Sequence, residues 1–571
     1  MPPPPASVIE TRFAQMFPTL EQAEVDRLGR FGETRTYAAG DRLVSTGEVS
    51  PGMFVILAGE VAVTQHNALG RDQPIVTHHA GSFMGELAQL SGRPALVDAR
   101  AITAVDALII STPRLRDVLV SEADLGERIM RALILRRVGL FETGIAGPTI
   151  VGHAGDGNVL RLVDFLRRNG HPYQSLDPDT DPDATTLIER FHVDRSKLPI
   201  VVCPGGQMLQ NPTEDELARC LGLVRPIDPT KVQDVAIVGA GPAGLAAAVY
   251  AASEGLSVIV LDCRAFGGQA GASARIENYL GFPTGITGMA LMARAFNQAQ
   301  KFGAEMVIPS QVVRLECVGG APDGARFQVH LKDGERVRTR AIIIASGAKY
   351  RHLPVADLEK YDASSVHYWA SPVEAKLCLG QEVALVGAGN SAGQAVVYLA
   401  THAAKVWVLV RGPSLAAKMS SYLVERIGSL PNVEVVTRSE VSALEGRDGI
   451  LQAVRWRSLA SGEETVRPIR HLFSFCGADP NTDWLSRSDV ELDDKGFVRT
   501  GTDLGHGHPA LLTSRDGVFA IGDVRAGSTK RVAAAVGEGA QVVATLHAFL
   551  ADVATGAPSP SVAAGGRAPV V

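Results

Sequence analysis

Cysteine is scarce in this chain, and none of it forms a closely spaced pair. The 571 residues include six cysteines, and no two of them make a C-x-x-C motif. Zinc knuckles and dithiol exchange motifs both depend on neighbouring thiols, so we predict no metal site and find no obvious dithiol. A few scattered cysteines are typical of proteins from a reducing compartment, and we expect a cytoplasmic protein.

Charge of one sign and membrane-targeting segments are also lacking. The chain has 55 Lys and Arg against 61 Asp and Glu, which predicts no nucleic-acid-binding surface. The first residues, MPPPPASVIE, lack the charged and apolar regions of a signal peptide. The longest uncharged stretch, residues 235–253, is long enough to cross a membrane, but its glycines and proline belong to a nucleotide-binding pattern. We therefore expect no membrane span.

What the chain does contain is enough apolar material for several packed domains. Hydrophobic residues make up 46% and charged residues 20%, which excludes a disordered chain, and the length predicts roughly four domains. From residue 36 to 112, short apolar runs alternate with turn signals, as in a β-roll. An amphipathic helix follows, and its pattern predicts a cap at Ser121 with Asp124 in the capping-box position.

The expected organisation is α/β, with two Rossmann-like domains preceded by a β-roll and a small α/β domain. The tail from residue 553 is rich in Ala, Pro and Gly and is predicted to be disordered. The predicted domains are residues 1–147 (β-roll and helices), 148–225 (small α/β domain), 232–348 with 482–552 (first nucleotide-binding domain), 349–481 (second nucleotide-binding domain, inserted in the first) and 553–571 (tail).

The first dinucleotide-binding pattern follows a predicted strand that begins near Asp234. Gly239 permits a tight turn, Gly241 lets the backbone approach a pyrophosphate, and Gly244 allows the helix to pack closely on the strand. The start of that helix offers N–H groups and a positive dipole end to phosphates. Asp262 ends the next strand, where its carboxylate can accept hydrogen bonds from a ribose.

A second copy of the pattern lies further along the chain. Gly387, Gly389 and Ala392 repeat the spacing, but the residue after the next strand is Arg411 rather than an acid. An arginine pairs with a ribose 2′-phosphate that a carboxylate would repel, so this site favours NADPH, with NADH as the alternative.

Further segments resemble signatures of bacterial thioredoxin reductases over residues 232–552. They are Gly267-Gly268-Gln269, residues 276–283 (IENYLGFP), 345–354 (ASGAKYRHLP), 475–485 (FCGADPNTDWL) and 517–524 (GVFAIGDV). The resemblance implies an FAD domain, an inserted NADPH domain hinged near 346–354 and 476–481, and a homodimer. By the resemblance, the FAD contacts are Gly239, Gly241, Gly244, Asp262, Gln269, Asn278 and Asp523, with Arg531 and Ala533 in a segment that opens a helix at the flavin ring.

The chain departs from this family where a C-x-x-C is expected. The corresponding stretch, residues 367–374, reads HYWASPVE. Trp369 and Pro372 occupy the two cysteine places in one alignment, and Ala370 and Val373 do in the other. Disulfide exchange needs a thiolate and a resolving thiol, so flavin-to-dithiol transfer is not supported here. Cys378 stands alone and is interpreted as structural.

Residues 148–224 resemble a thioredoxin or glutaredoxin fold, with Leu198-Pro199 in the place of its cis-proline loop. The resemblance implies a cysteine pair after the first strand, but residues 154–158 contain none. Whether Cys203 and Cys220 meet, and whether they or Cys378 have a redox role, stays open. We interpret the block as a redox-silent docking or spacer module.

Residues 83–88 (FMGELA), after the β-roll, resemble the phosphate-binding cassette of cyclic-nucleotide-binding domains. By that resemblance, the backbone at Gly85–Leu87 would hold a phosphate and Glu86 would accept from a ribose hydroxyl. In this chain Ala95 stands at the position of the family's phosphate-binding arginine. Arg93 or Arg100 would have to supply the missing charge. The candidate ligand residues are Gly85, Glu86, Leu87 and Arg93. The ligand stays open between a cyclic nucleotide, another phosphorylated molecule and none.

These patterns predict an FAD-dependent NAD(P)H oxidoreductase of thioredoxin reductase-like type that lacks the redox dithiol. NADPH would reduce the flavin, and the electrons would pass to ferredoxin, a quinone, a small molecule or a partner's disulfide. No catalytic side chain is predicted, because the protein supplies position and electrostatics. The alternatives are a thioredoxin reductase that uses other cysteines and a non-catalytic sensor of flavin or nucleotide. Regulation through the N-terminal domain is a further expectation.

Overall fold

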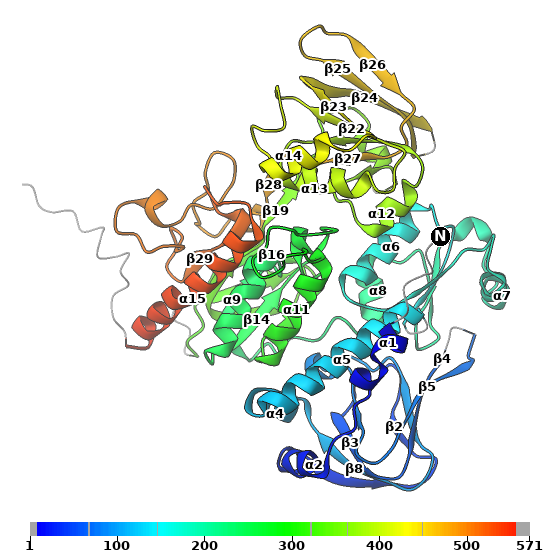
Figure 1. Ribbon diagram of the computed structural model, residues 1–571. Coiled ribbons are helices and arrows are strands. Elements are labelled where there is room, and N and C mark those ends of the chain that lie inside the picture. The colour runs from blue at the N-terminus through cyan, green and yellow to red at the C-terminus, as the bar shows by residue number, and fades with distance from the viewer. Residues whose placement is uncertain are drawn as a thin grey trace, which may run out of the picture. The chain divides into compact units, whose positions relative to one another are not determined.

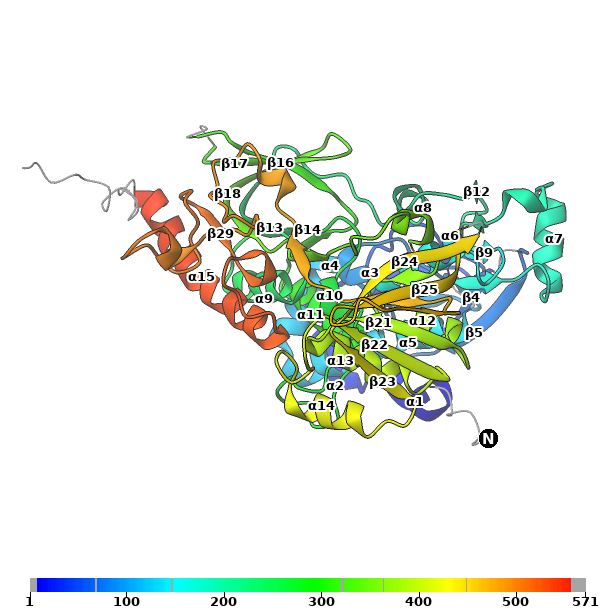
Figure 2. The same ribbon diagram turned by 90° about the horizontal axis from the view of Figure 1, so that it is seen from above.

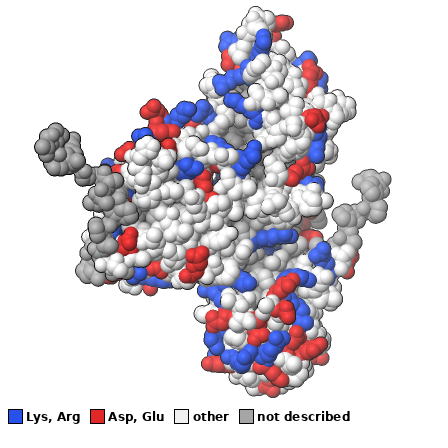
Figure 3. All heavy atoms as spheres, turned by 60° about the vertical axis from the view of Figure 1, so that its left-hand side comes forward, with Lys and Arg blue, Asp and Glu red and all other residues white. Residues whose placement is uncertain are grey.

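The computed structural model describes residues 8–66, 69–144, 147–319, 323–362, 364–447 and 449–555 (Figure 1). The chain divides into two compact units. The first comprises Met1–Ala154, Phe165–Pro226 and Asn297–Pro309, and the second comprises Gly155–Asp164, Ile227–Phe296 and Ser310–Val571. On the face shown in Figure 3, Lys and Arg side chains are interspersed with Asp and Glu.

Two antiparallel four-stranded sheets form the expected β-roll in the first unit. Their strand orders are β1-β8-β3-β6 and β2-β7-β4-β5. Alternate residues of β4 are buried, as expected for a strand with one face on the core. The strands are β1 Glu33–Tyr37, β2 Arg42–Val44, β3 Met53–Ala58, β4 Val61–His66, β5 Asp72–His78, β6 Phe83–Met84, β7 Asp98–Ala101 and β8 Val105–Ile110. The helices are α1 Val8–Met16, α2 Gln22–Leu28, η1 Gly29–Phe31, α3 Ala88–Ser91, α4 Thr112–Ser121 and α5 Ala123–Thr143.

The predicted cap at Ser121 is wrong. Ser121 is the last residue of α4, and its Oγ donates to the Asp117 carbonyl at 2.7 Å. Helix α5 begins two residues later, after Glu122, which makes no side-chain cap. The sequence pattern missed α4, which starts at Thr112 with a proline in its first turn and occupies the serine before α5 begins.

A second, smaller sheet in the first unit has the strand order β10-β9-β11-β12. Strand β10 is parallel to β9, and β11 is antiparallel to both β9 and β12. The Leu198–Pro199 bond before β11 is cis. The elements are β9 Thr149–Val151, α6 Gly157–Arg168, β10 Gln174–Leu176, α7 Pro182–Arg190, η2 Arg195–Lys197, β11 Ile200–Val202, β12 Met208–Gln210 and α8 Glu214–Cys220.

A larger sheet, whose strands other than β15 belong to the second unit, carries the first glycine motif. Its strand order is β15-β14-β13-β18-β17-β16, with β29 beside β18, and β14, β13, β18 and β29 run parallel. The elements are β13 Val232–Val238, α9 Pro242–Ser253, β14 Val258–Leu261, α10 Gly268–Gly271, α11 Gly288–Lys301, β15 Glu305–Val307, β16 Val312–Cys317, β17 Phe327–Leu331, β18 Arg336–Ile344, η5 Gly501–Leu504, β29 Val518–Ala520, η6 Gly522–Val524 and α15 Val532–Thr555.

Helix α15 lies along α9 in both ribbon views (Figures 1 and 2). A Cβ on Gly539 would come within 2.7 Å of the Ala243 carbonyl oxygen, so glycine permits this close approach. By length and apolar composition, Val532–Val553 could also cross a membrane, which is a weak indication because core helices pass the same test. The tail predicted at residues 553–571 is wrong in its first three residues, which are the last residues of α15, and residues 556–571 lie outside the described part of the chain.

A second parallel sheet, with the order β20-β27-β21-β22-β23, carries the other glycine motif. The two expected hinge segments pair with each other as the antiparallel strands β19 and β28. The elements are β19 Ala348–Tyr350, η3 Leu358–Tyr361, β20 Val366–His367, α12 Pro372–Leu377, β21 Glu382–Val386, α13 Asn390–Leu399, β22 Lys405–Val410, α14 Ser421–Gly428, β23 Val433–Thr437, β24 Ser439–Arg447, β25 Ile450–Ser458, β26 Glu464–Arg467, β27 Leu472–Ser474, β28 Ala478–Pro480 and η4 Asp483–Leu485.

Candidate active site

The first glycine motif forms a tight turn at the carboxyl end of β13. Gly239 has a φ of +114°, and an added Cβ would lie 2.1 Å from the Ala345 carbonyl oxygen. A Cβ on Gly244 would lie 1.9 Å from the Gly239 carbonyl oxygen. Gly241 caps α9, and a Cβ there would meet its first atom only at 3.9 Å. Two of the glycines therefore serve close packing, and the third leaves room in front of the helix.

Asp262 follows β14, beside this turn. Its carboxylate accepts hydrogen bonds from the backbone N–H of Ala240 at 2.9 Å and of Arg264 at 3.1 Å. Because β13 and β14 are parallel, Asp262 and Gly239 lie at the same edge of the sheet. The backbone therefore fixes the orientation of an acceptor next to the start of α9.

Three more expected contact residues lie on other segments of the same domain. The Gln269 side chain in α10 donates to the Ala348 carbonyl. Asn278 is exposed in the loop before α11. Asp523 lies in η6, directly after β29, and burial raises the pKa of its carboxyl, while Lys530 opposes and Glu538 adds to that shift. The structure brings Asp523 to the edge that carries Gly239 and Asp262, because β29, β18 and β13 are parallel.

Arg531 and Ala533 lie at the start of α15, and both are exposed. The first N–H groups of a helix have no partner within it, so this terminus offers donors and a positive dipole end. These open donors, the glycine cradle at α9 and the fixed Asp262 acceptor fit a dinucleotide such as FAD.

Sequence reasoning missed Glu538. Its carboxylate accepts from the Gly522 N–H at 2.6 Å and pairs with Arg525 at 2.6 Å, so it fixes the turn that presents Asp523. A signal was available, because Glu538 is a single acidic residue in a run of Ala, Gly and Val in α15.

The second glycine motif repeats the arrangement at the carboxyl end of β21. A Cβ on Gly387 would lie 2.9 Å from the Phe475 Cβ and 3.1 Å from the Ala392 Cβ. Gly389 caps α13, and a Cβ there would meet nothing within 4 Å. Arg411 follows β22 at the same edge and is exposed. The site combines an open helix start with a cation one strand away.

The segment where a dithiol was expected is a helix cap. Ser371 and Glu374 form a capping box at the start of α12, and both side chains are buried. The Trp369 Nε1 donates to the Glu374 carboxylate at 3.1 Å. Cys378, at the end of this helix, is buried in the domain core, and burial raises the pKa of its thiol to about 12. At neutral pH this thiol stays protonated and is a poor nucleophile.

Cys203 and Cys220 form a disulfide, which the sequence left open. Cys203 follows β11, and Cys220 is the last residue of α8. Because Val202 pairs with Thr149, the disulfide lies at the amino end of β9. Residues 154–158, the place of a thioredoxin-type dithiol, follow the opposite end of that strand. The disulfide is therefore not in the expected active-site position.

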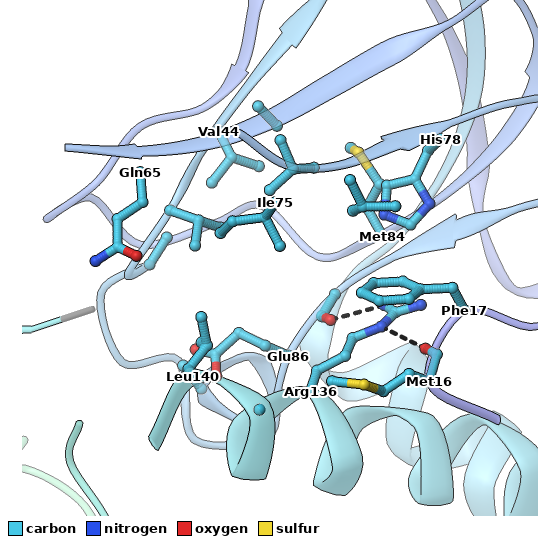
Figure 4. Close-up of a pocket in the computed structure, with 18 of the residues that line it drawn as sticks. Met16, Phe17, Val44, Gln65, Ile75, His78, Met84, Glu86, Arg136 and Leu140 are labelled. Carbon is cyan, nitrogen blue, oxygen red and sulfur yellow. Dashed lines mark hydrogen bonds between the residues drawn. The ribbon is translucent and has the colours of Figure 1, made fainter. Parts of the chain in front are cut away.

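The expected phosphate cassette borders a cavity of about 210 Å³ between the β-roll and α5 (Figure 4). Gly85, Glu86 and Arg93 line it, whereas Leu87 caps α3 outside the lining. Glu86 forms an ion pair with Arg137. Burial, together with Arg137 and Arg225, lowers the pKa of Arg93 to about 10. Arg100 donates to the Gly40 carbonyl and does not line the cavity.

Comparison with known families gives two matches. Residues 233–539 match the family described as pyridine nucleotide-disulphide oxidoreductase, and residues 34–122 match the cyclic nucleotide-binding domain. These matches agree with the predicted Rossmann-type core and the predicted β-roll. Residues 123–232, which contain the small sheet and the disulfide, lie outside both matches.

Individual proteins are similar over the same part of the chain. A thioredoxin reductase of Mycolicibacterium smegmatis is 32% identical over 321 residues, which are 56% of this chain and 97% of that protein. The NADPH-dependent thioredoxin reductase 3 of Arabidopsis thaliana is 34% identical over 331 residues, covering 56% and 58%. The structure of Lactococcus lactis thioredoxin reductase in its FR conformation superposes with a TM-score of 0.51 at 28% identity, covering 56% of this chain and 99% of that one.

Proposed function

We propose, from the premise that this chain belongs to the pyridine nucleotide-disulphide oxidoreductase family, that it oxidises NADPH and delivers the electrons to an acceptor outside its two nucleotide-binding folds. The family makes it an FAD-dependent pyridine nucleotide oxidoreductase with FAD and NADPH as cofactors. The observation that carries the proposal is the capping box at Ser371 and Glu374, which fills the place of the redox dithiol.

The chain's own residues bind and orient in this proposal. The open start of α9 and the Asp262 carboxylate hold one dinucleotide, and the start of α15 offers N–H donors toward its ring end. The open start of α13 holds the pyrophosphate of the other, and Arg411 pairs with a 2′-phosphate. FAD, when bound, supplies a two-electron carrier that takes a hydride from the nicotinamide.

The acceptor is proposed to be ferredoxin, a quinone, a small molecule or a disulfide of a partner protein. An acceptor screen distinguishes these classes by stoichiometry, because ferredoxin takes one electron per molecule and a disulfide takes two electrons and two protons. We also propose a homodimer in the cytoplasm, on the resemblance to thioredoxin reductases.

Anaerobic reduction tests the proposal. We expect NADPH to bleach the visible flavin absorbance of the purified protein. The variant Gly389→Val tests the nucleotide site, because a Cβ at this position meets no protein atom within 4 Å and the valine side chain occupies the space in front of α13. It should keep its flavin and lose most of the reduction rate.

Gly428→Ala, at the end of α14, is the matched control, since a Cβ there also meets nothing within 4 Å. It should be reduced like the unmodified protein. If neither NADPH nor NADH bleaches the unmodified protein within minutes, the proposal is wrong.

A second candidate rests on the Cys203–Cys220 disulfide. In it, NADPH and one proton reduce this disulfide to two thiols by way of the flavin, as in a thioredoxin reductase with displaced cysteines. Thiol titration of the denatured protein after anaerobic NADPH treatment should then show two additional thiols. Cys203→Ser should abolish that gain, and Cys317→Ser should not. An unchanged thiol count in the unmodified protein excludes this candidate.

A further inference from the structure

The cavity in the β-roll is lined mainly by carbon. Its walls come from α1, from the strands of the roll and from the last turns of α5, which supplies Leu140. In Figure 4, Val44, Ile75 and Met84 face the cavity from the roll, and Met16, Phe17 and Leu140 close it from the helix side. Ala95 adds a methyl group where a phosphate-binding arginine is expected. Such a lining favours an apolar ligand.

Arg136, the cation of α5 that borders the cavity, is hydrogen-bonded to the backbone. The three guanidinium nitrogens of Arg136 donate to the carbonyls of Met16 at 2.9 Å, Gly85 at 2.9 Å and Phe83 at 3.0 Å. Its guanidinium also lies over the rings of Phe17 and Phe83. Arg136 therefore fixes the backbone of the cassette and does not present its charge to a ligand.

Two side chains of the cavity wall, Glu86 and Gln89, each present an open acceptor, and the wall also contains Arg93, whose Nη2 atom is buried. One oxygen of Glu86 pairs with Arg137, and the other, Oε1, is buried without a partner among the described residues. Gln89 is 7% exposed, and its Nε2 donates to the Gly52 carbonyl at 2.7 Å, whereas its Oε1 is likewise buried and unpartnered. A buried acceptor without a donor is unfavourable, so both oxygens fit a ligand that donates an N–H or O–H.

His78 adds no charge to the cavity wall. It is 4% exposed, and burial, with Arg136 and His79 nearby, lowers its pKa to about 3. The side chain is therefore neutral at physiological pH.

The volume of the cavity limits the size of the ligand. Its volume of about 210 Å³ exceeds the ~150 Å³ apolar cavity that accepts benzene and is below the ~300 Å³ at which sites for drug-sized molecules begin. One or two fused rings fit this range.

We propose that this cavity binds an uncharged, largely apolar molecule of one or two rings, whose O–H or N–H donates to Glu86 or Gln89, in preference to a cyclic nucleotide. The inference concerns the β-roll alone and holds whichever acceptor the oxidoreductase core uses.

Fluorescence titration of the full-length protein with β-naphthol is the test. We expect saturable binding at one site per chain. The methyl ether of β-naphthol, which cannot donate, should bind about tenfold more weakly, as expected for the loss of one hydrogen bond to a charged or buried acceptor. Cyclic AMP, cyclic GMP and adenosine should not displace the probe at concentrations where excess β-naphthol does.

Two variants tie the binding to this cavity. Val97→Phe fills it and should abolish binding, whereas Ile102→Phe, at a residue that is 49% exposed and outside the lining, should not. Gln89→Met keeps the side-chain volume but removes one hydrogen-bond acceptor. It should therefore reduce the difference in affinity between β-naphthol and its methyl ether.

Failure of the unmodified chain to bind β-naphthol saturably would overturn the proposal, and this result does not depend on whether any variant folds. Tighter binding of a cyclic nucleotide or of adenosine than of β-naphthol would overturn it as well.

Discussion

At the scale of single residues, Arg411 carries the predicted preference for NADPH. It is exposed at the carboxyl end of β22, beside the open start of α13. We expect Arg411→Ala to lower kcat/KM for NADPH by about tenfold or more, because a hydrogen bond between charged groups contributes ~1.5–3 kcal/mol. Initial rates with both nucleotides measure this. Turnover with NADH is the internal control and should not change, and an equal loss with both nucleotides would assign Arg411 a structural role.

Residue roles were predictable from the sequence where backbone geometry leaves few choices. Gly239 and Gly244 were assigned to a turn and to close packing, and the structure places a carbonyl oxygen within about 2 Å of the Cβ that each lacks. The role of Glu538 was not found, because its partner Gly522 is 16 residues away; the lone acid among Ala, Gly and Val marks the residue but does not indicate its partner.

At the scale of elements, the packing of α9 on β13 depends on the absence of a side chain at Gly244. In Gly244→Ala the new Cβ would lie 1.9 Å from the Gly239 carbonyl oxygen, so the helix must shift. We expect a loss of ~1–3 kcal/mol in the free energy of unfolding of this domain and a lowered flavin content. Denaturant unfolding and the flavin-to-protein absorbance ratio measure the two effects.

Gly537→Ala in α15 is the matched control, because a Cβ there meets nothing within 4 Å. It should leave flavin content unchanged and stabilise the helix by up to about 1 kcal/mol. Equal flavin loss in both variants would contradict the packing argument.

The disulfide acts at the same scale, since it joins the end of β11 to the end of α8. It closes a loop of 17 residues, and a cross-link of that span stabilises by about 3 kcal/mol. We expect Cys203→Ser to destabilise the small α/β domain by this order. Limited proteolysis should detect the change as faster cleavage within residues 148–225, and Cys317→Ser should not produce it. Unchanged cleavage would show that the disulfide contributes little stability.

The elements that the sequence predicted best were those marked by closely spaced turn signals or by a glycine motif. The roll, the two βαβ units and the lack of a dithiol within residues 367–374 were all visible in the sequence. The start of α5 was misplaced, because Ser121 fits a cap pattern but belongs to the preceding helix. The pairing of Cys203 with Cys220 was left open, because a sequence separation does not determine a distance.

At the scale of the whole molecule, buried histidines predict acid sensitivity. Burial lowers the pKa of His367 to about 4 and, with His367 and Arg470, that of His471 to about 3, from an ordinary value of 6.5. The unfolded chain therefore takes up protons below pH 6.5 that the folded chain refuses. Stability should fall as pH drops from 6.5 toward 4, by about 1.4 kcal/mol per pH unit for each histidine.

Thermal unfolding between pH 7.5 and 5 measures this loss. His471→Asn should flatten the dependence, because it removes one of two rings that contact each other at 3.1 Å. His506→Asn, in an exposed loop, should leave it as it is. A melting temperature that does not change between pH 7 and pH 5 would contradict the prediction.

The apolar lining of the cavity in the roll could not be predicted from the sequence, because it depends on the tertiary fold. Its walls join α1, the middle of the roll and the end of α5, so Met16, Val97 and Leu140 meet only after folding. The cassette at Gly85–Leu87 predicted where a ligand site lies, but its local pattern says nothing about the chemistry of the opposite wall.

Helix α5 connects that cavity to the next part of the chain. Its 21 residues form a rod of about 30 Å, with Gly139, Leu140 and Thr143 bordering the cavity at one end. Strand β9 begins shortly afterwards, at Thr149. A ligand held against Leu140 would therefore contact the last turns of the helix that precedes the small sheet in the chain.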